Sequence, residues 1–127
     1  MIRSERTVGM IEKTTIMNHA LSSPQRMRIM KVLGSAEINT RSVSDVANIL
    51  GISQSTVTKH LQVLYRAGFV KRKKVASTVY YSADAEGLAE YRKLIDCAFI
   101  AQQTDCVNNW ECDNCPEKVN CNTDFQF

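Results

Sequence analysis

Apolar side chains recur every three or four residues along much of this chain, a spacing that predicts α-helices. Residues 7–21 and 22–34 show this pattern first. The second segment contains Ser23, a residue type that caps helix starts, followed by Pro24, whose fixed φ suits the first helical turn. Gly34 then provides a stop signal. Two helices are therefore predicted before residue 35.

A short helix, a tight turn and a longer helix are predicted next. The segment SVSDVANIL places valines and a leucine on one face, and its Ser42 and Asp45 have the S-x-x-D spacing of a helix start. Gly51 marks the turn. Ser53 can cap a further helix, which ends at Gly68. This order of elements is a helix-turn-helix.

The longer helix sorts its side chains into two faces. At about 100° per residue, Val57, Leu61 and Leu64 form one apolar stripe. His60 lies on the shoulder of that stripe, which favours a packed, hydrogen-bonded histidine over a metal ligand. The opposite face is polar and basic, as insertion into a DNA major groove requires. The residues predicted to contact DNA from this helix and its cap are Ser53, Gln54, Ser55, Thr58, Lys59 and Gln62.

The next segment, FVKRKKVASTVYYSA, predicts two short antiparallel strands that form a wing. Its valines and tyrosines flank a polar middle. The tip, KKVAST, contains neither Gly nor Asn for its turn. Four basic residues on the first strand or tip could contact phosphates or reach into the minor groove: Lys71, Arg72, Lys73 and Lys74.

Together these segments resemble the ArsR/SmtB family of winged-helix transcriptional repressors over roughly residues 15–100. The resemblance rests on LSSPQRMRIMKVL, on VSDVANILGISQSTVTKHLQVLYRAGFVKRK and on the closing VYYS of the wing. It implies a mainly α fold with a small β-hairpin wing, that is, a winged helix-turn-helix that forms a homodimer. It also implies a repressor that leaves its operator when a small inducer or metal binds.

A last helix is predicted from ADAEGLAEYRKLIDCAFIAQQ. Its apolar stripe has no obvious remaining partner in so small a domain, so we expect it to pair with the first helix across the two-fold axis of a homodimer. Such a dimer would read a pseudo-palindromic duplex operator. Cys97 lies in this helix, where a buried thiol is the commoner outcome. A ligand role for Cys97 stays open, because related repressors place inducer sites on this helix.

Charge is segregated along the chain in a way that the net charge of +3 conceals. Residues 24–74 contain ten Lys or Arg and two acidic residues, a net charge of +8, whereas residues 84–127 carry −6. A basic middle indicates a polyanionic partner, of which nucleic acid is the commonest. The alternative interpretation of this basic segment is a solvent-exposed charged surface with no binding partner.

The length of 127 residues suits one domain with an appendage, predicted as a winged helix-turn-helix domain over residues 1–104 and a tail over 105–127. No apolar run approaches the roughly 20 residues of a membrane helix, and the N-terminus lacks a signal-peptide pattern. We therefore expect a cytoplasmic protein with no membrane partner. The chain has no Gly-rich phosphate loop, nucleophile elbow or plausible carboxylate pair, so an enzyme is not expected.

The tail holds four of the five cysteines in the spacing C-x5-C-x2-C-x5-C: Cys106, Cys112, Cys115 and Cys121. In a reducing compartment such clusters are more often metal ligands or redox centres than structural disulfides. Cys112 and Cys115 can coordinate one metal ion, and the sulfurs of Cys106 and Cys121 can complete a tetrahedral site, which favours zinc. An iron–sulfur cluster, a thiophilic ion such as As(III) or Cd(II), and a thiol–disulfide switch remain alternatives.

The predicted function is a DNA-binding transcriptional regulator, a repressor by the resemblance, which responds to a metal, iron–sulfur or redox signal at the C-terminal cysteines. One alternative is the same regulator with a purely structural zinc tail and an unrelated effector. Another is a helix-turn-helix used as a protein-interaction module without DNA binding. Lys59 together with the KRKK run favours DNA.

Overall fold

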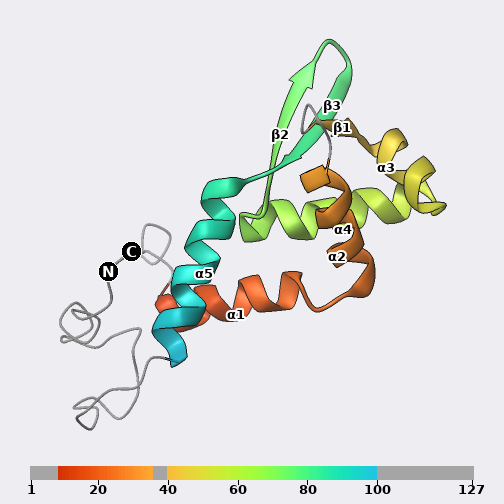
Figure 1. Cartoon of the computed structure of the whole chain (residues 1–127). Coiled ribbons are helices and arrows are strands. Elements are labelled where there is room, and N and C mark those ends of the chain that lie inside the picture. The colour runs from red at the N-terminus through yellow and green to blue at the C-terminus, as the bar shows by residue number, and fades with distance from the viewer. Residues whose placement is uncertain (1–8, 36–39, 100–127) are drawn as a thin grey trace, which may run out of the picture.

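The structure is a computed structural model that describes residues 9–35 and 40–99. These residues form a mainly helical domain with a three-stranded antiparallel sheet, which confirms the predicted winged helix-turn-helix (Figure 1). Within this part of the chain, no helix combines the length and apolar character that a membrane crossing needs. The elements are α1 (Met10–Ala20), α2 (Pro24–Ser35), β1 (Arg41–Ser42), α3 (Val43–Leu50), α4 (Gln54–Ala67), β2 (Val70–Val75), β3 (Thr78–Ala83) and α5 (Ala85–Phe99).

The helix-turn-helix begins and ends at the residues that its capping pattern predicted. The Ser42 hydroxyl accepts the Asp45 amide and the Asp45 carboxylate accepts the Ser42 amide, both at 3.1 Å, so a complete capping box starts α3. Gly51 ends α3 in the left-handed region, with φ 68°. Ser53 caps α4, and Gly68 ends it with φ 91°. Both glycines occupy a conformation that other residues rarely adopt.

The predicted stop at Gly34 is one residue early, because α2 continues through Gly34 to Ser35. A β-carbon on Gly34 would meet no atom within 4 Å. Glycine is therefore not required there by a close contact or a left-handed turn.

The apolar core lies where α1, α2, α3 and α4 meet the base of the wing. Val57, Leu61 and Leu64 have no exposed surface, which confirms the predicted stripe on α4. The buried apolar residues are Met17, Ala20, Ile29, Leu33, Val46, Ala47, Val57, Leu61, Leu64, Ala67, Phe69, Val70 and Tyr81.

The sheet has the strand order β1-β3-β2. Strands β2 and β3 form the predicted hairpin, in register from Val70 opposite Ala83 to Val75 opposite Thr78. The two-residue turn between them places Ala76 in the left-handed region with φ 56°, since the tip offers no glycine. The sequence did not predict β1, a two-residue strand that pairs Arg41 with Tyr81 of the wing.

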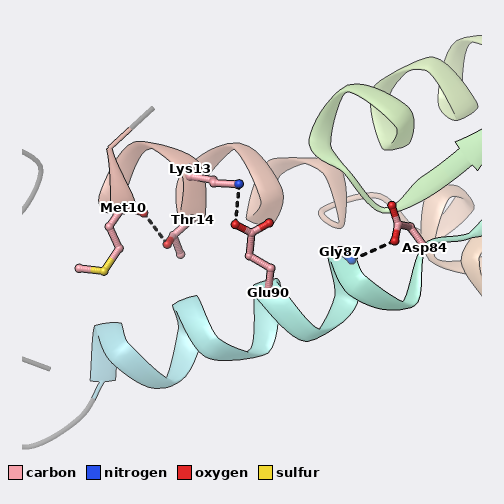
Figure 2. A network of polar contacts seen from close by, with 6 residues as sticks. All are labelled: Met10, Lys13, Thr14, Asp84, Gly87 and Glu90. Atoms are coloured by element: carbon pink, nitrogen blue, oxygen red, sulfur yellow. Dashed lines mark hydrogen bonds and ion pairs between the residues drawn. The ribbon is translucent and has the colours of Figure 1, made fainter. Parts of the chain in front are cut away.

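Helix α5 starts directly against the end of α4. The Asp84 amide donates to the Phe69 carbonyl at 2.9 Å. The Asp84 carboxylate accepts the amides of Glu86 and Gly87 at 3.1 Å each, and Figure 2 shows the bond to Gly87. A β-carbon on Gly87 would lie 2.9 Å from the carbonyl carbon of Gly68 and closer still to its oxygen. Only glycine allows α5 to approach α4 so closely at this point.

Helices α1 and α5 lie side by side (Figures 1 and 2). Lys13 pairs with Glu90 at 2.6 Å, and the Tyr91 hydroxyl donates to Asn18 Oδ1 at 2.7 Å. The apolar stripe of α5 was expected to lack a partner within the domain, and this expectation is wrong for much of its length. Three stripe residues pack against the core of their own chain: Leu88, Tyr91 and Leu94.

Candidate nucleic-acid interface

The outward side of α4 carries the residues predicted to enter a DNA groove. Gln54, Ser55, Lys59 and Gln62 are exposed, and Thr58 is half-buried. Because the opposite stripe is fully buried, the core fixes the direction in which this polar face points. Helix α4 spans 14 residues, a length of about 21 Å.

Ser53 serves chiefly to start this helix. Its hydroxyl accepts the Thr56 amide at 3.2 Å and donates to the Thr56 hydroxyl at 2.8 Å. The Ser55 hydroxyl lies 3.2 Å from the Ser53 hydroxyl oxygen. The single proton of the Ser53 hydroxyl is therefore engaged within the helix cap, which leaves Gln54, Lys59 and the other exposed side chains of α4 to donate outward.

The four basic wing residues are all exposed on β2, but they do not share one face. Successive residues of a strand point to opposite sides, so Lys71 and Lys73 lie on one face of the hairpin while Arg72 and Lys74 lie on the other. The Arg72 guanidinium sits 4.0 Å from the centre of the Tyr65 ring on α4. This cation–π contact links the wing to the helix. The sequence pattern did not single out Tyr65, because the contact joins two separate elements.

His60 is half-buried at the inner edge of α4, and its ring takes part in a hydrogen bond, as predicted. Its Nδ1 lies 3.3 Å from Nη1 of Arg26, a residue of α2. Burial and the neighbouring Arg26 charge both lower the pKa of His60. Arg26 was not among the residues predicted from the sequence to have a functional role.

Of the predicted cysteine ligands, the structure describes Cys97 alone, which lies half-buried on α5. Cys106, Cys112, Cys115 and Cys121 lie outside the described residues. Across residues 9–35 and 40–99, no group of three or more His, Cys, Asp or Glu side chains is placed to hold a metal ion.

A hollow of about 650 Å³ lies beside the start of α5, away from the outward face of α4. Its lining includes the carboxylates of Asp84, Glu86 and Glu90, with Lys93 as the basic member. An excess of negative charge is a poor match for a phosphate backbone. The basic face of α4 and the wing fit that partner better.

Comparison with known proteins finds transcriptional regulators among the relatives of this chain. A family model described as a helix-turn-helix domain matches residues 21–73. A cadmium resistance transcriptional regulatory protein, a CadC homolog of Staphylococcus aureus, is 38% identical over 85 residues, which cover 66% of this chain and 65% of the relative. An SmtB homolog of Synechocystis sp., a transcriptional repressor, is 36% identical over 61% of this chain and 57% of its own length. The match thus spans less than two thirds of each of these relatives.

A third relative, an uncharacterized HTH-type transcriptional regulator of Methanocaldococcus jannaschii, is 32% identical over 67% of this chain and 93% of its own length. These names describe transcriptional regulators and no enzyme, as expected from the sequence.

Solved structures share the fold. An ArsR-like transcriptional regulator from Rhodococcus sp. RHA1 superposes with a TM-score of 0.63 at 29% identity, covering 70% of this chain and 81% of that one. A winged helix-turn-helix domain from Mycobacterium bovis, described as homodimeric, gives a TM-score of 0.57 at 23% identity and covers 69% of this chain and 79% of its own.

Proposed function

The chain belongs to the ArsR/SmtB family of winged-helix transcriptional regulators, and from this premise we propose that it binds duplex DNA through the outward face of α4 and the β2–β3 wing. The observation that carries the proposal is the division of α4 into a fully buried apolar stripe and an exposed polar face bearing Lys59 and Gln62. Amide and ammonium groups on such a face can meet base edges and phosphate oxygens in a major groove.

A protein-interaction module would be expected to expose apolar side chains on this face. The large exposed apolar residue of α4 is Tyr65, and its ring is covered by the Arg72 guanidinium of the wing. The face therefore favours a polyanion over an apolar protein partner. In this proposal Lys71, Lys73 and Lys74 contact phosphates, and Arg72 orients the wing against α4 as well as contributing charge.

We propose further that the chain acts as a homodimer through α1 and α5. Both helices still expose large apolar side chains: Ile11 is 41% exposed, Ile16 is 43% exposed and Phe99 is 80% exposed. A two-fold dimer would present two copies of α4 to a pseudo-palindromic operator.

The effector proposal rests on the sequence of the tail. Cys106, Cys112, Cys115 and Cys121 would hold a metal ion or an iron–sulfur cluster, and release or capture of that ligand would change operator affinity. A relative named for cadmium resistance supports a metal over an unrelated effector. By family resemblance the chain would act as a repressor, with residues 105–127 forming a regulatory tail on the winged-helix domain of residues 1–104.

A charge-reversal experiment tests DNA binding. The pair Lys59→Glu and Gln62→Ala should abolish binding to a duplex that the wild-type chain selects from a random library, because both side chains point away from the core. Circular dichroism and sedimentation should show an unchanged fold and dimer. Lys31→Glu, an equal charge reversal at an exposed position of α2, is the matched control. Unchanged affinity of the double variant would show that α4 does not enter the groove.

The wing is tested through salt dependence. Lys73→Ala with Lys74→Ala should weaken binding to all duplexes alike, and the slope of log affinity against log salt should fall by about 0.9 for each phosphate that is no longer neutralised. A weakening confined to particular sequences would instead mean that the wing reads bases or groove shape.

The tail is tested on protein purified without oxygen. Metal analysis and an absorption spectrum should reveal a bound metal or cluster that Cys112→Ser with Cys115→Ser removes. Titration of the selected duplex with the as-isolated, chelated, oxidised and Cd(II)- or As(III)-loaded chain then measures the coupling. Equal affinity in every state would make the tail a structural element with no regulatory role.

A further inference from the structure

The side chain of Arg26 joins three helices at one point. It extends from α2, and its Nε donates to the Ala20 carbonyl at 2.7 Å while its Nη2 donates to the His19 carbonyl at 3.2 Å. Both carbonyls belong to the last turn of α1. Its Nη1 lies 3.3 Å from Nδ1 of His60 on α4.

The contact with α1 is favourable for a reason that belongs to helix ends. The last carbonyls of a helix have no partner within it, and they form the negative end of the helix dipole. The guanidinium of Arg26 supplies a donor to the Ala20 carbonyl and a further donor to the His19 carbonyl, which also accepts the Ser22 amide and hydroxyl, and it adds positive charge at this end. Arg26 therefore fixes the end of α1 from a neighbouring helix.

The contact with α4 determines the state of the His60 ring. A guanidinium offers donors alone, so Nδ1 of His60 must accept, which requires a neutral ring with its proton on Nε2. A protonated ring would offer a donor to a donor and would set two positive charges side by side. The contact and a protonated His60 are thus incompatible.

We propose that Arg26 is a positioning residue for DNA binding, because it ties α4 to the end of α1 through a link that holds only while His60 is neutral. This inference rests on the proposed function, in which α4 enters the groove and α1 lies in the dimer interface. His60 directly follows Lys59 on α4, so a change in the ring's contact acts at the centre of the groove-facing helix.

The charges around His60 set the sign of the effect. On α2, Arg26 is the charged group that lowers the pKa of His60. On α1, the neighbouring groups are the His19 and Ala20 carbonyls and the exposed His19 ring. On α4 itself, the adjacent charged residue is Lys59. Since the folded chain holds His60 with a pKa below its ordinary value of about 6.5, the link is complete above that pH. It breaks as the pH falls through the lowered pKa.

The experiment measures affinity for the duplex selected by the wild-type chain, at fixed salt, as the pH falls from about 7.5 to about 5.5. The wild-type chain should lose affinity as the pH falls through the lowered pKa of His60. His60→Asn keeps an acceptor near the Nδ1 position and cannot be protonated in this range, so its profile should be flat. His19→Gln removes the exposed ring but keeps the carbonyl that binds Arg26, and its profile should follow the wild type.

Arg26→Lys should lower affinity at neutral pH by about fivefold or more, because one ammonium cannot span three acceptors, while circular dichroism stays unchanged. A His60→Asn profile that declines with the wild type would overturn the inference. So would a ring-nitrogen NMR spectrum of the wild-type chain that shows a proton on Nδ1 at neutral pH. A wild-type chain that selects no duplex would refute the proposed function and the DNA-binding role given to Arg26, whereas intact binding with a flat wild-type profile would refute this inference alone.

Discussion

Gly87→Ala tests how tightly α5 is seated on the end of α4. The new methyl group would collide with the carbonyl of Gly68, at 2.9 Å from its carbon and closer to its oxygen. The carbonyl has little freedom to move, since Gly68 ends α4 at φ 91° and donates its amide to Tyr65 O at 3.1 Å. The first turn of α5 must therefore shift away.

The cost of that shift has three parts. Overpacking at a close contact typically costs about 1–3 kcal/mol. Displacing α5 also weakens the bond from the Asp84 amide to the Phe69 carbonyl, which contributes about 0.5–1.5 kcal/mol. Alanine recovers about 1 kcal/mol over glycine inside a helix. The free energy of unfolding should fall by about 2 kcal/mol, a large share of a typical total of about 5–15.

Urea denaturation at fixed protomer concentration measures the change, because the stability of a dimer depends on concentration. Gly34→Ala is the matched control: it adds the same methyl group to a helix where nothing lies within 4 Å, so it should raise stability by about 0.5–1 kcal/mol. A Gly87→Ala chain as stable as the wild type would refute the close approach of α5 to α4.

Three further substitutions test local features of the domain by the same denaturation assay. Ser42→Ala removes the capping box of α3 and should lower stability by about 1 kcal/mol, so an unchanged midpoint would contradict the role of the cap. Ala76→Gly relieves the left-handed turn of the wing and should raise stability by about 0.5–1 kcal/mol, whereas Ser77→Gly should not; equal effects would argue against strain at Ala76. Lys13→Ala should change stability by no more than about 0.5 kcal/mol, since the Lys13–Glu90 pair is 39% and 48% exposed; a larger decrease would mean that the pair is worth more than its exposure indicates.

Features that depend on a few neighbouring residues could be predicted from the sequence. The capping box of Ser42, the αL glycines at 51 and 68, and the buried stripe on α4 all follow from short-range geometry. The helical period also placed His60 at the edge of the core. That position explains why its ring meets a hydrogen-bond partner rather than solvent alone.

The partners of these features could not be predicted, because they come from distant parts of the chain. The sequence showed the apolar stripe of α5 but not its contact with the core of the same chain. An amphipathic pattern indicates that one face of a helix is covered, but it does not identify the element that covers it. Likewise a basic run on β2 gave no sign that Arg72 would stack on Tyr65 of α4.

Local sequence was enough to predict the caps that begin and end α3 and α4, the buried face of α4 and the basic run on β2, because each depends on residues within one or two turns. Two contacts became visible only in the folded chain: Arg26 reaches both the end of α1 and His60, and Gly87 lies against Gly68. Those contacts depend on how the helices cross. Crossing is set by the packing of the whole core, to which every element contributes and which no local pattern encodes.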